Sequence, residues 1–255
     1  MYKFDAIREK ENIVQWIKDY FHINGINSKC IIGISGGTDS SVVAALCVEA
    51  LGNDNVYGIL MPCGLQKDIN YSYDLCKELN IKYHEIDLFD TYNTFINEIN
   101  FNLDKDRIDN KIMSNILPRI RMTTLYTMSA ILQGRVANTS NLSEITIGWE
   151  TKWGDNVGDF SPLREYTKTE VKEIGNLLLD TKYVSKEPED GMCGFSDEHM
   201  FGFTYEILDK YIRTGVCNSP IIRDTIICMN KASYHKNKIL SCNPDLFNYI
   251  KDTNN

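Results

Sequence analysis

The chain has 255 residues, a formal net charge of −8, 43% hydrophobic residues and 24% charged residues. These values are ordinary for one large globular domain or two small ones. The acidic balance argues against a nucleic-acid partner, because sequence-independent binding needs clustered Lys and Arg. The sequence has no signal-peptide pattern and no apolar run of about 18 residues, so no membrane span is expected. Eight cysteines without C-x-x-C spacing favour reduced thiols in a cytoplasmic protein.

Taken in order, the first ninety residues alternate between helical and extended patterns. Strands are expected at 30–34, 56–61, 81–88 and 136–139, and helices at 4–22, 39–51, 67–80, 90–99, 115–133, 168–179, 204–213 and 220–232. This alternation predicts a doubly wound α/β fold with a parallel sheet and helices on both faces. In such folds, ligands bind at the carboxyl ends of the strands.

Two loops in the second half have a composition typical of binding segments. Residues 148–160 contain glycines, tryptophans and aspartates, and residues 181–196 form a second long loop. Trp149 and Trp153 in the first loop are equally compatible with ring stacking on a ligand and with packing. Between the loops, Thr167-x-x-Glu170 matches a capping box at a helix start.

The strongest motif follows the first strand directly. The run Ser35-Gly36-Gly37-Thr38-Asp39-Ser40 turns from a strand into a helix. Its glycines allow close approach of the backbone, and the helix N-terminus presents N–H groups to an anion. Asp39 is a candidate Mg²⁺ ligand beside bound phosphates. The alternative without function is a generic tight turn between a strand and a helix.

Two other motifs compete for the same residues. The run is not a Walker A motif, because no Gly-Lys-Ser/Thr follows at the required spacing. Residues 33–37 do match G-x-S-x-G, the nucleophile elbow of α/β-hydrolases. That elbow normally follows several strands, whereas here it follows the first, and His84, His199 and His235 have no telling context. The phosphate interpretation is therefore favoured.

The SGG-x-DS run resembles the pyrophosphate loop of ATP-pyrophosphatases, which cleave ATP between its α- and β-phosphates. The rest of the chain, from about residue 12 to 236, is similar to the ammonia-dependent NAD⁺ synthetases. The shared motifs are Gly33 to Ser40, Gln66-Lys67-Asp68, Pro118 to Met122, Asn138 to Glu144, Gly148 to Asp155, Asp159, Thr167-Lys168-Thr169, Asp197-Glu198 with Gly202, and His235-Lys236. The resemblance implies a single NAD synthetase domain over residues 1–255, with five parallel strands.

The resemblance also implies a reaction. The nicotinate carboxylate of deamido-NAD⁺ attacks the α-phosphorus of ATP, pyrophosphate leaves, and an acyl-adenylate forms. Ammonia then attacks the activated carbonyl and gives NAD⁺ and AMP. Mg²⁺ is the implied cofactor and a homodimer the implied assembly, with the helix at 115–133 and the C-terminal segment as candidate interface. The sequence lacks the amidohydrolase domain of glutamine-dependent relatives, so free or delivered ammonia is expected.

Site residues carry over from the family position by position. For ATP they are Gly33, Ile34, Ser35, Gly36, Gly37, Thr38, Asp39, Ser40, Thr139 and Lys168. For deamido-NAD⁺ they are Arg119, Lys152, Asp159, His235 and Lys236. Asp39 and Glu144 are the implied Mg²⁺ ligands, and Asp39, Lys168 and Asp159 the implied catalytic residues. For Asp159, hydrogen bonding to a ligand hydroxyl and to the incoming ammonia both remain open.

Some features of the chain depart from the family pattern. Asn138 stands where the family often has glycine, and Glu189 where many members have a small hydroxyl residue that touches ATP, so this contact is not carried over. Two alternative functions stay open: another pyrophosphate-loop enzyme, such as a tRNA-modifying thiolase, and a non-catalytic adenine-nucleotide binder. The acidic charge counts against the first, and the presence of Asp39, Glu144 and Lys168 counts against the second.

Overall fold

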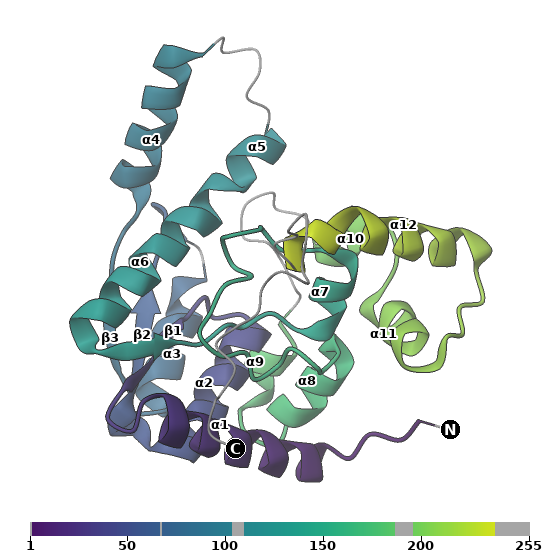
Figure 1. Ribbon diagram of the computed structural model, residues 1–255, viewed down its shortest axis with the longest axis horizontal. Helices are drawn as coiled ribbons and strands as arrows, with labels where there is room; N and C mark the ends of the chain where they lie inside the picture. Colours follow the sequence, from purple (N-terminus) through teal and green to yellow (C-terminus); the bar gives the residue numbers. More distant parts are fainter. Residues whose placement is uncertain (1, 67, 104–109, 187–195, 238–255) are drawn as a thin grey trace, which may run out of the picture.

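The computed structural model describes residues 2–66, 68–103, 110–186 and 196–237 (Figure 1). Its strands are β1 (Lys29–Gly33), β2 (Val56–Leu60), β3 (Lys82–Glu85) and β4 (Gly134–Val136). Its helices are α1 (Ala6–Asn24), α2 (Thr38–Leu51), α3 (Ile69–Glu78), α4 (Phe89–Asn102), α5 (Asn110–Ser114), α6 (Ile116–Leu132), α7 (Leu142–Ile147), α8 (Lys168–Gly175), α9 (Thr181–Val184), α10 (Asp197–Phe201), α11 (Tyr205–Thr214) and α12 (Pro220–Asn237), with a short 3₁₀ turn η1 (Asn53–Asn55).

The sheet is parallel, as predicted, and β1 lies inside it. The strand order is β3-β2-β1-β4, and Ile31 of β1 pairs with Tyr57 on one side and Val136 on the other. Because β1 has neighbours on both sides, its carboxyl end opens at the middle of the sheet edge. The Ser-Gly-Gly turn starts there, at the position where ligands bind in open α/β sheets.

The expectation of five strands is wrong for the described part of the chain, which has four. A fifth segment runs beside β4, but only a single parallel bridge forms, between Ala137 and Phe160. Pro162 follows two residues later and has no N–H to continue the pairing, and Arg164 N already turns back to Ser161 O at 3.4 Å. The segment therefore ends before it becomes a strand.

Alternate residues of β1 pack against different helices. Cys30 and Ile32, with Ile34 directly after the strand, lie in a buried cluster with side chains of α1, α2 and α8. Ile31 belongs instead to a cluster with Leu117 and other side chains of α6. This period of two follows from the pleat of a strand, and it explains the nearly continuous apolar run in the sequence.

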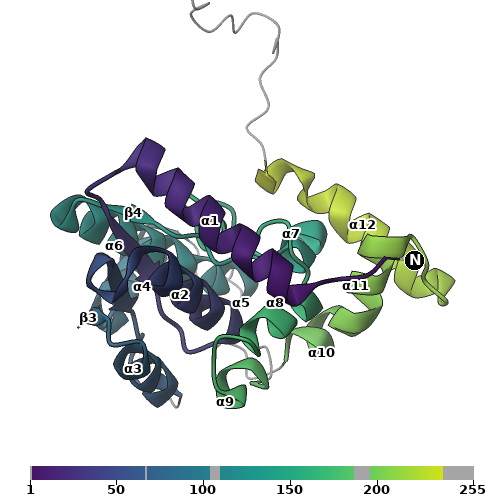
Figure 2. The ribbon, with the colours of Figure 1, turned by 90° about the horizontal axis from the view of Figure 1, so that it is seen from below.

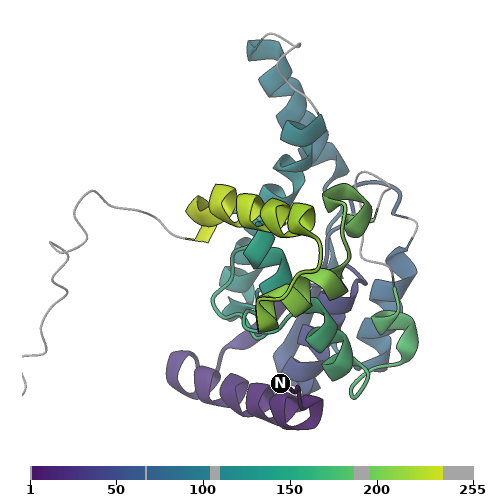
Figure 3. The same cartoon turned by 90° about the vertical axis from the view of Figure 1, so that its right-hand side faces the viewer.

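The helices cover both faces, and one part of the fold stands away from the sheet. Figure 2 shows α1 lying across the outside of α2, and the two helices pack together. Figures 1 and 3 show α4 projecting beyond the sheet, with α12 crossing above α7. Across the described ranges, none of the helices combines the length and the apolar character that a membrane crossing requires.

Several boundaries differ from the sequence expectations. The strand expected at 136–139 lies at Gly134–Val136, because Asn138 curls the chain by accepting a hydrogen bond from Ser140 N at 3.1 Å. The helix expected at 115–133 is confirmed as α6, which the short and unexpected α5 precedes, and the loop expected at 181–196 begins with α9. The short helices α7 and α10 were not expected, since neither is long enough to show a helical period.

Candidate active site

The turn after β1 is built for close approach of a ligand to the backbone. Gly36 has a φ of +74°, and a Cβ there would lie 2.9 Å from Tyr71 Cβ. Gly37 is the N-cap of α2 and has no side-chain capping hydrogen bond. The start of α2 therefore keeps its N–H groups and its positive dipole end available to an anion.

The hydroxyl groups of this motif hold the turn itself together. Ser35 Oγ accepts a hydrogen bond from Gly37 N at 3.2 Å and lies 3.1 Å from Ser40 Oγ. Ser40 Oγ and Ser41 Oγ lie 3.1 and 2.8 Å from Gly37 O. Thr38 Oγ1 donates to Tyr183 O at 3.1 Å. These contacts fix a preformed loop rather than activate Ser35 as a nucleophile.

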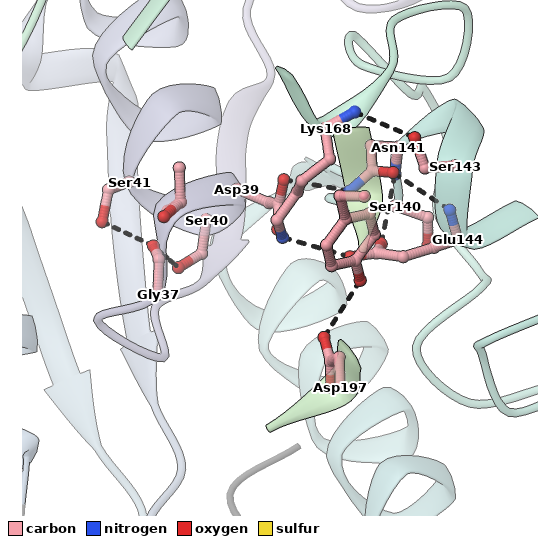
Figure 4. Close-up of polar contacts among 12 residues, drawn as sticks. Gly37, Asp39, Ser40, Ser41, Ser140, Asn141, Ser143, Glu144, Lys168 and Asp197 are labelled. Carbon is pink, nitrogen blue, oxygen red and sulfur yellow. Dashed lines mark hydrogen bonds and ion pairs between the residues drawn. The ribbon is translucent and has the colours of Figure 1, made fainter. Parts of the chain in front are cut away.

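Next to this turn, Lys168 joins two carboxylates from distant parts of the chain (Figure 4). Its Nζ forms an ion pair with Asp39 Oδ2 and lies 3.3 Å from Glu144 Oε1. The Lys168 side chain is 4% exposed, while each carboxylate side chain is 17% exposed, so the ammonium lies at the bottom of the group. The structure thus brings together three residues that the sequence separates widely.

Asn141 links the same two carboxylates from the other side. Its Nδ2 donates to Asp39 Oδ1 at 3.1 Å, and its Oδ1 accepts from Glu144 N at 3.1 Å. Glu144 Oε2 in turn accepts from Asn141 N at 3.3 Å. The two residues form a capping box at the start of α7. The sequence pattern Asn141-x-x-Glu144 is the signal that marks this helix start.

The charges in this group strongly affect one another. Burial and the neighbouring Asp39 carboxylate raise the pKa of Glu144 to about 8, although Lys168 opposes the shift. Burial alone lowers the pKa of Lys168, but Asp39 and Glu144 outweigh it and the net pKa is raised. The ammonium therefore stays charged at neutral pH, and the two carboxylates compete for a single positive charge.

These oxygen ligands suit a hard divalent cation whose remaining ligands are phosphate oxygens and water. Asp39 and Glu144 offer carboxylate oxygens on the two sides of one positive charge. Mg²⁺ prefers such oxygens and usually binds through one or two carboxylates plus substrate phosphates. No cluster of three or more His, Cys, Asp or Glu residues that could hold a metal by itself occurs in the described ranges. The protein groups thus fit a cation that arrives with a phosphate ligand.

The residues expected to bind the dinucleotide form a second group around the 148–160 loop. Arg119 Nε donates to Lys152 O at 3.2 Å, and Lys152 Nζ donates to His235 O at 2.6 Å. Lys236 Nζ donates to Gly148 O at 2.7 Å and to the main-chain oxygen of Glu150 at 2.6 Å. The end of α12 is therefore fastened to this loop by the predicted residues.

Asp159 and Thr139 are two further predicted residues, and the carboxylate of the first makes its contacts away from this group. Asp159 Oδ2 accepts from Val136 N at 2.7 Å, and Oδ1 accepts from Tyr126 OH at 3.3 Å, so this carboxylate joins β4 to α6. Thr139 is half-buried on the segment between β4 and α7. Glu189 and the remainder of its loop lie outside the described residues.

Sequence reasoning missed a buried polar layer beneath Lys168. Asp209 of α11 is 4% exposed and accepts a hydrogen bond from Thr169 N at 2.8 Å. Tyr205 of the same helix is 3% exposed, and its ring centroid lies 5.3 Å from Lys168 Nζ. The sequence predicted a helix here, but no pattern in it indicated which side of the helix meets α8.

Comparison with known proteins identifies the family. The family model for NAD synthase matches residues 9–242. The chain belongs to the NAD synthase family. An NH(3)-dependent NAD(+) synthetase of Carboxydothermus hydrogenoformans is 36% identical over 232 residues, which cover 90% of this chain and 94% of that relative. The fold and the motif order of this NAD synthase family member therefore agree with the resemblance, and the tRNA-modifying alternative is set aside.

Solved structures give the same result for the whole fold. An NH3-dependent NAD synthetase from Campylobacter jejuni has a TM-score of 0.75 and 26% identity, and the match covers 94% of this chain and 99% of that one. A structure described as NMN synthetase from Francisella tularensis has a TM-score of 0.84 and 27% identity, with 94% and 98% of the two chains covered. These two neighbours bear names that differ in the nucleotide product.

Proposed function

We propose that this chain is an ammonia-dependent NAD⁺ synthetase, a ligase that amidates deamido-NAD⁺ at the expense of ATP. The observation that carries the proposal is the Asp39–Lys168–Glu144 group beside the uncapped start of α2, in a chain of the NAD synthase family. A carboxylate reacts poorly with ammonia, so it must first gain a leaving group. The nicotinate carboxylate attacks the α-phosphorus of ATP, pyrophosphate leaves, and ammonia then displaces AMP from the acyl-adenylate.

In this proposal, the chain's own residues bind the leaving pyrophosphate and neutralise its charge. The N–H groups at the start of α2 receive phosphate oxygens, and Gly36 lets the backbone approach them. The Lys168 ammonium contributes positive charge where the negative charge of the leaving group develops. Ser35 and Ser40 keep the loop in its binding conformation.

Asp39 and Glu144 are the proposed Mg²⁺ ligands. Both carboxylates contact Lys168, and together they would hold a divalent cation beside the ammonium, with the ATP phosphates as its further ligands. When bound, Mg²⁺ neutralises charge on the pyrophosphate as it leaves. The proposed binding site for deamido-NAD⁺ consists of Arg119, Lys152, His235 and Lys236. Asp159 remains a proposed contact of deamido-NAD⁺, although its carboxylate joins β4 to α6 away from that group.

We further propose that the chain forms a single domain and that the protein is a cytoplasmic homodimer. Exposed apolar side chains on α4 and α6 support an assembly: Phe101 is 87% exposed, Phe95 50% and Ile131 67%. Separate apolar side chains of this size are common on surfaces, but three along neighbouring helices suit a contact with a second copy.

The decisive assay combines ATP, Mg²⁺, deamido-NAD⁺ and ammonium, and it follows NAD⁺, AMP and pyrophosphate together. We expect the three products in equal amounts. Release of pyrophosphate without NAD⁺ would indicate an ATP-pyrophosphatase that uses another acceptor. ATP binding without formation of NAD⁺ or pyrophosphate would indicate a non-catalytic nucleotide binder. Absence of NAD⁺ at every ammonium concentration contradicts the proposed function.

A second acceptor is worth testing in the same assay. The structural neighbour described as NMN synthetase has the higher TM-score of the two compared, 0.84 against 0.75. Nicotinate mononucleotide carries the same carboxylate without the adenylate half, so the same chemistry applies to it. The ratio of kcat/KM for the two acceptors decides between them, and we expect deamido-NAD⁺ to be preferred because the curated relative at 36% identity is an NAD(+) synthetase.

A further inference from the structure

Helix α11 presents one buried side to the region where α7 meets α8. Tyr205 and Asp209 are four residues apart and therefore lie on the same side of this helix. They are 3% and 4% exposed, and the mechanism proposed above uses neither. Both act on the surroundings of Lys168, one at its main chain and one at its ammonium.

Asp209 ties the first turn of α8 to α7. Its Oδ2 accepts a hydrogen bond from Thr169 N at 2.8 Å, and its Oδ1 accepts from Ser143 Oγ at 2.5 Å. Ser143 Oγ in turn accepts from Lys168 N at 2.9 Å. Thr169 follows Lys168 directly, and Ser143 precedes Glu144. One buried carboxylate thus fixes the relative position of the two helix starts that carry the site residues.

The same contacts use up the free N–H groups at the start of α8. Lys168 N and Thr169 N donate as described, and the capping box satisfies Glu170 N through the Thr167 side chain. The start of α2 has no such side-chain cap. Helix α8 can therefore bind an anion through the Lys168 ammonium but not through its N-terminal N–H groups. The position of that ammonium then determines how α8 contributes to anion binding.

Tyr205 restrains the ammonium itself. Its ring centroid lies 5.3 Å from Lys168 Nζ, within the range of a cation–π interaction. Its hydroxyl donates to Asp197 Oδ2 at 3.0 Å, which fixes the ring, and Asp197 is 6% exposed. The ring closes one side of the ammonium, and Asp39 and Glu144 occupy others.

We propose that Asp209 and Tyr205 are positioning residues, which act through Lys168 and set where its ammonium lies. The inference rests on the proposed function only in taking Lys168 as a ligand of ATP. Asp209 fixes the main chain at the start of α8 through Ser143 and Thr169, and Tyr205 contacts the ammonium through its ring. Because a displacement of about 1 Å in a catalytic group can cost about 100-fold in rate, small shifts of α8 are enough to matter.

The test compares two substitutions at position 209 with a control on the same helix. We expect Asp209→Ala to raise KM for ATP and lower kcat, each by about tenfold or more. Asp209→Asn should retain most activity, because its amide oxygen still accepts from Thr169 N and its amide nitrogen can donate to Ser143 Oγ. Thr204→Ala removes the N-cap of α11, which accepts from Ile207 N at 3.4 Å, and should lower the melting temperature while kcat and KM stay unchanged.

A double-mutant comparison shows whether the effect passes through Lys168. ATP affinity is measured by calorimetry for Asp209→Ala in the native background and in a Lys168→Met background. We expect Asp209→Ala to lower ATP affinity about tenfold in the native background and not at all in the Lys168→Met background. The reason is that the effects of substitutions at coupled residues are not additive. Equal losses in both backgrounds, or an Asp209→Ala variant that behaves like Thr204→Ala, would overturn the proposal.

Further variants keep the test usable if Asp209→Ala does not fold. Ser143→Ala removes the acceptor of Lys168 N and should reproduce the loss of ATP affinity. Tyr205→Phe keeps the ring and should bind ATP nearly as the native chain does, whereas Tyr205→Leu should bind it more weakly. Equal affinity of the Phe and Leu variants contradicts the role of the ring. Calorimetry needs no amidation, so failure of NAD⁺ formation in the native chain counts against the proposed function alone.

Discussion

At the scale of single residues, Asp39 connects the phosphate loop to the rest of the site. It lies in the first turn of α2, pairs with Lys168 and accepts a hydrogen bond from Asn141. The two pairs bridge 129 and 102 residues of sequence. The motif around Asp39 could be found because its members are contiguous. Its partners could be found only through resemblance to a family, since nothing local marks Lys168 or Glu144 as its neighbours.

Asp39→Asn tests this position. The amide keeps the size of the side chain and an oxygen facing Asn141, so the fold should persist, with circular dichroism and melting temperature close to native. The loss of charge should reduce pyrophosphate release by about 100-fold or more, because transition-state charge is no longer neutralised. Glu49→Gln is the matched control, since it removes a carboxylate from the same helix at a position where Glu49 pairs with Lys10. Unchanged turnover of Asp39→Asn would disprove the metal role.

The raised pKa of Glu144 leads us to expect that cation binding depends on pH. Its pKa is raised to about 8 by burial and by Asp39, so part of the population is protonated at neutral pH. Mg²⁺ must displace this proton, and its affinity in the presence of ATP should increase by up to about tenfold per pH unit, levelling off above pH 8. Calorimetry in buffers of different ionisation enthalpy measures the released proton. Glu144→Gln should bind Mg²⁺ more weakly and without this slope; a native affinity independent of pH would contradict the prediction.

The raised pKa of Glu144 also determines how the stability of the fold changes with pH. The folded protein binds the Glu144 proton more tightly than the unfolded chain does, where the pKa is near 4.5. The contribution of this group to the free energy of unfolding is therefore largest below that value, and it is lost as pH rises to about 8. Mg²⁺ with ATP should offset this loss by binding the ionised carboxylate.

At the scale of elements, the capping pattern predicted one helix start and could have predicted another. Thr167-x-x-Glu170 opens α8, and the structure confirms it. Asn141-x-x-Glu144 opens α7 in the same way, but α7 has six residues and no helical period to draw attention to it. Short helices depend on tertiary contacts for most of their stability, which is why sequence patterns reveal them poorly.

Gly148, at the end of α7, predicts a close contact with α12. It has a φ of +67°, and a Cβ there would lie 2.0 Å from Ser233 Cβ. Gly148→Ala should therefore lower the free energy of unfolding by about 1–3 kcal/mol or displace α12. Gly202→Ala is the matched control: its φ is +80°, yet a Cβ there meets nothing within 4 Å. Chemical denaturation of both variants separates the contact from the backbone cost. Equal losses would show that α12 does not constrain this position.

At the scale of the whole molecule, the projecting arm suggests assembly. Helix α4 stands away from the sheet, and Phe95 and Phe101 on it are 50% and 87% exposed (Figures 1 and 3). A chain of 29.3 kDa should therefore elute as a dimer of twice that mass in size-exclusion chromatography with light scattering. Phe95→Asp combined with Ile131→Asp should shift it towards the monomer, whereas Ile7→Asp, at a 61% exposed position on α1, should not. A native monomer at micromolar concentration would contradict the assembly.

What the sequence determined by itself is the alternation of strand and helix, the parallel sheet and the phosphate turn at the end of β1. These features are local, because each depends on the period of apolar residues or on glycines at adjacent positions. Only the tertiary structure decided that the sheet has four strands among the described residues, and that Lys168 lies between Asp39 and Glu144 above Tyr205. Those outcomes depend on which elements pack together, and on the burial of charges that separate segments bring to one place.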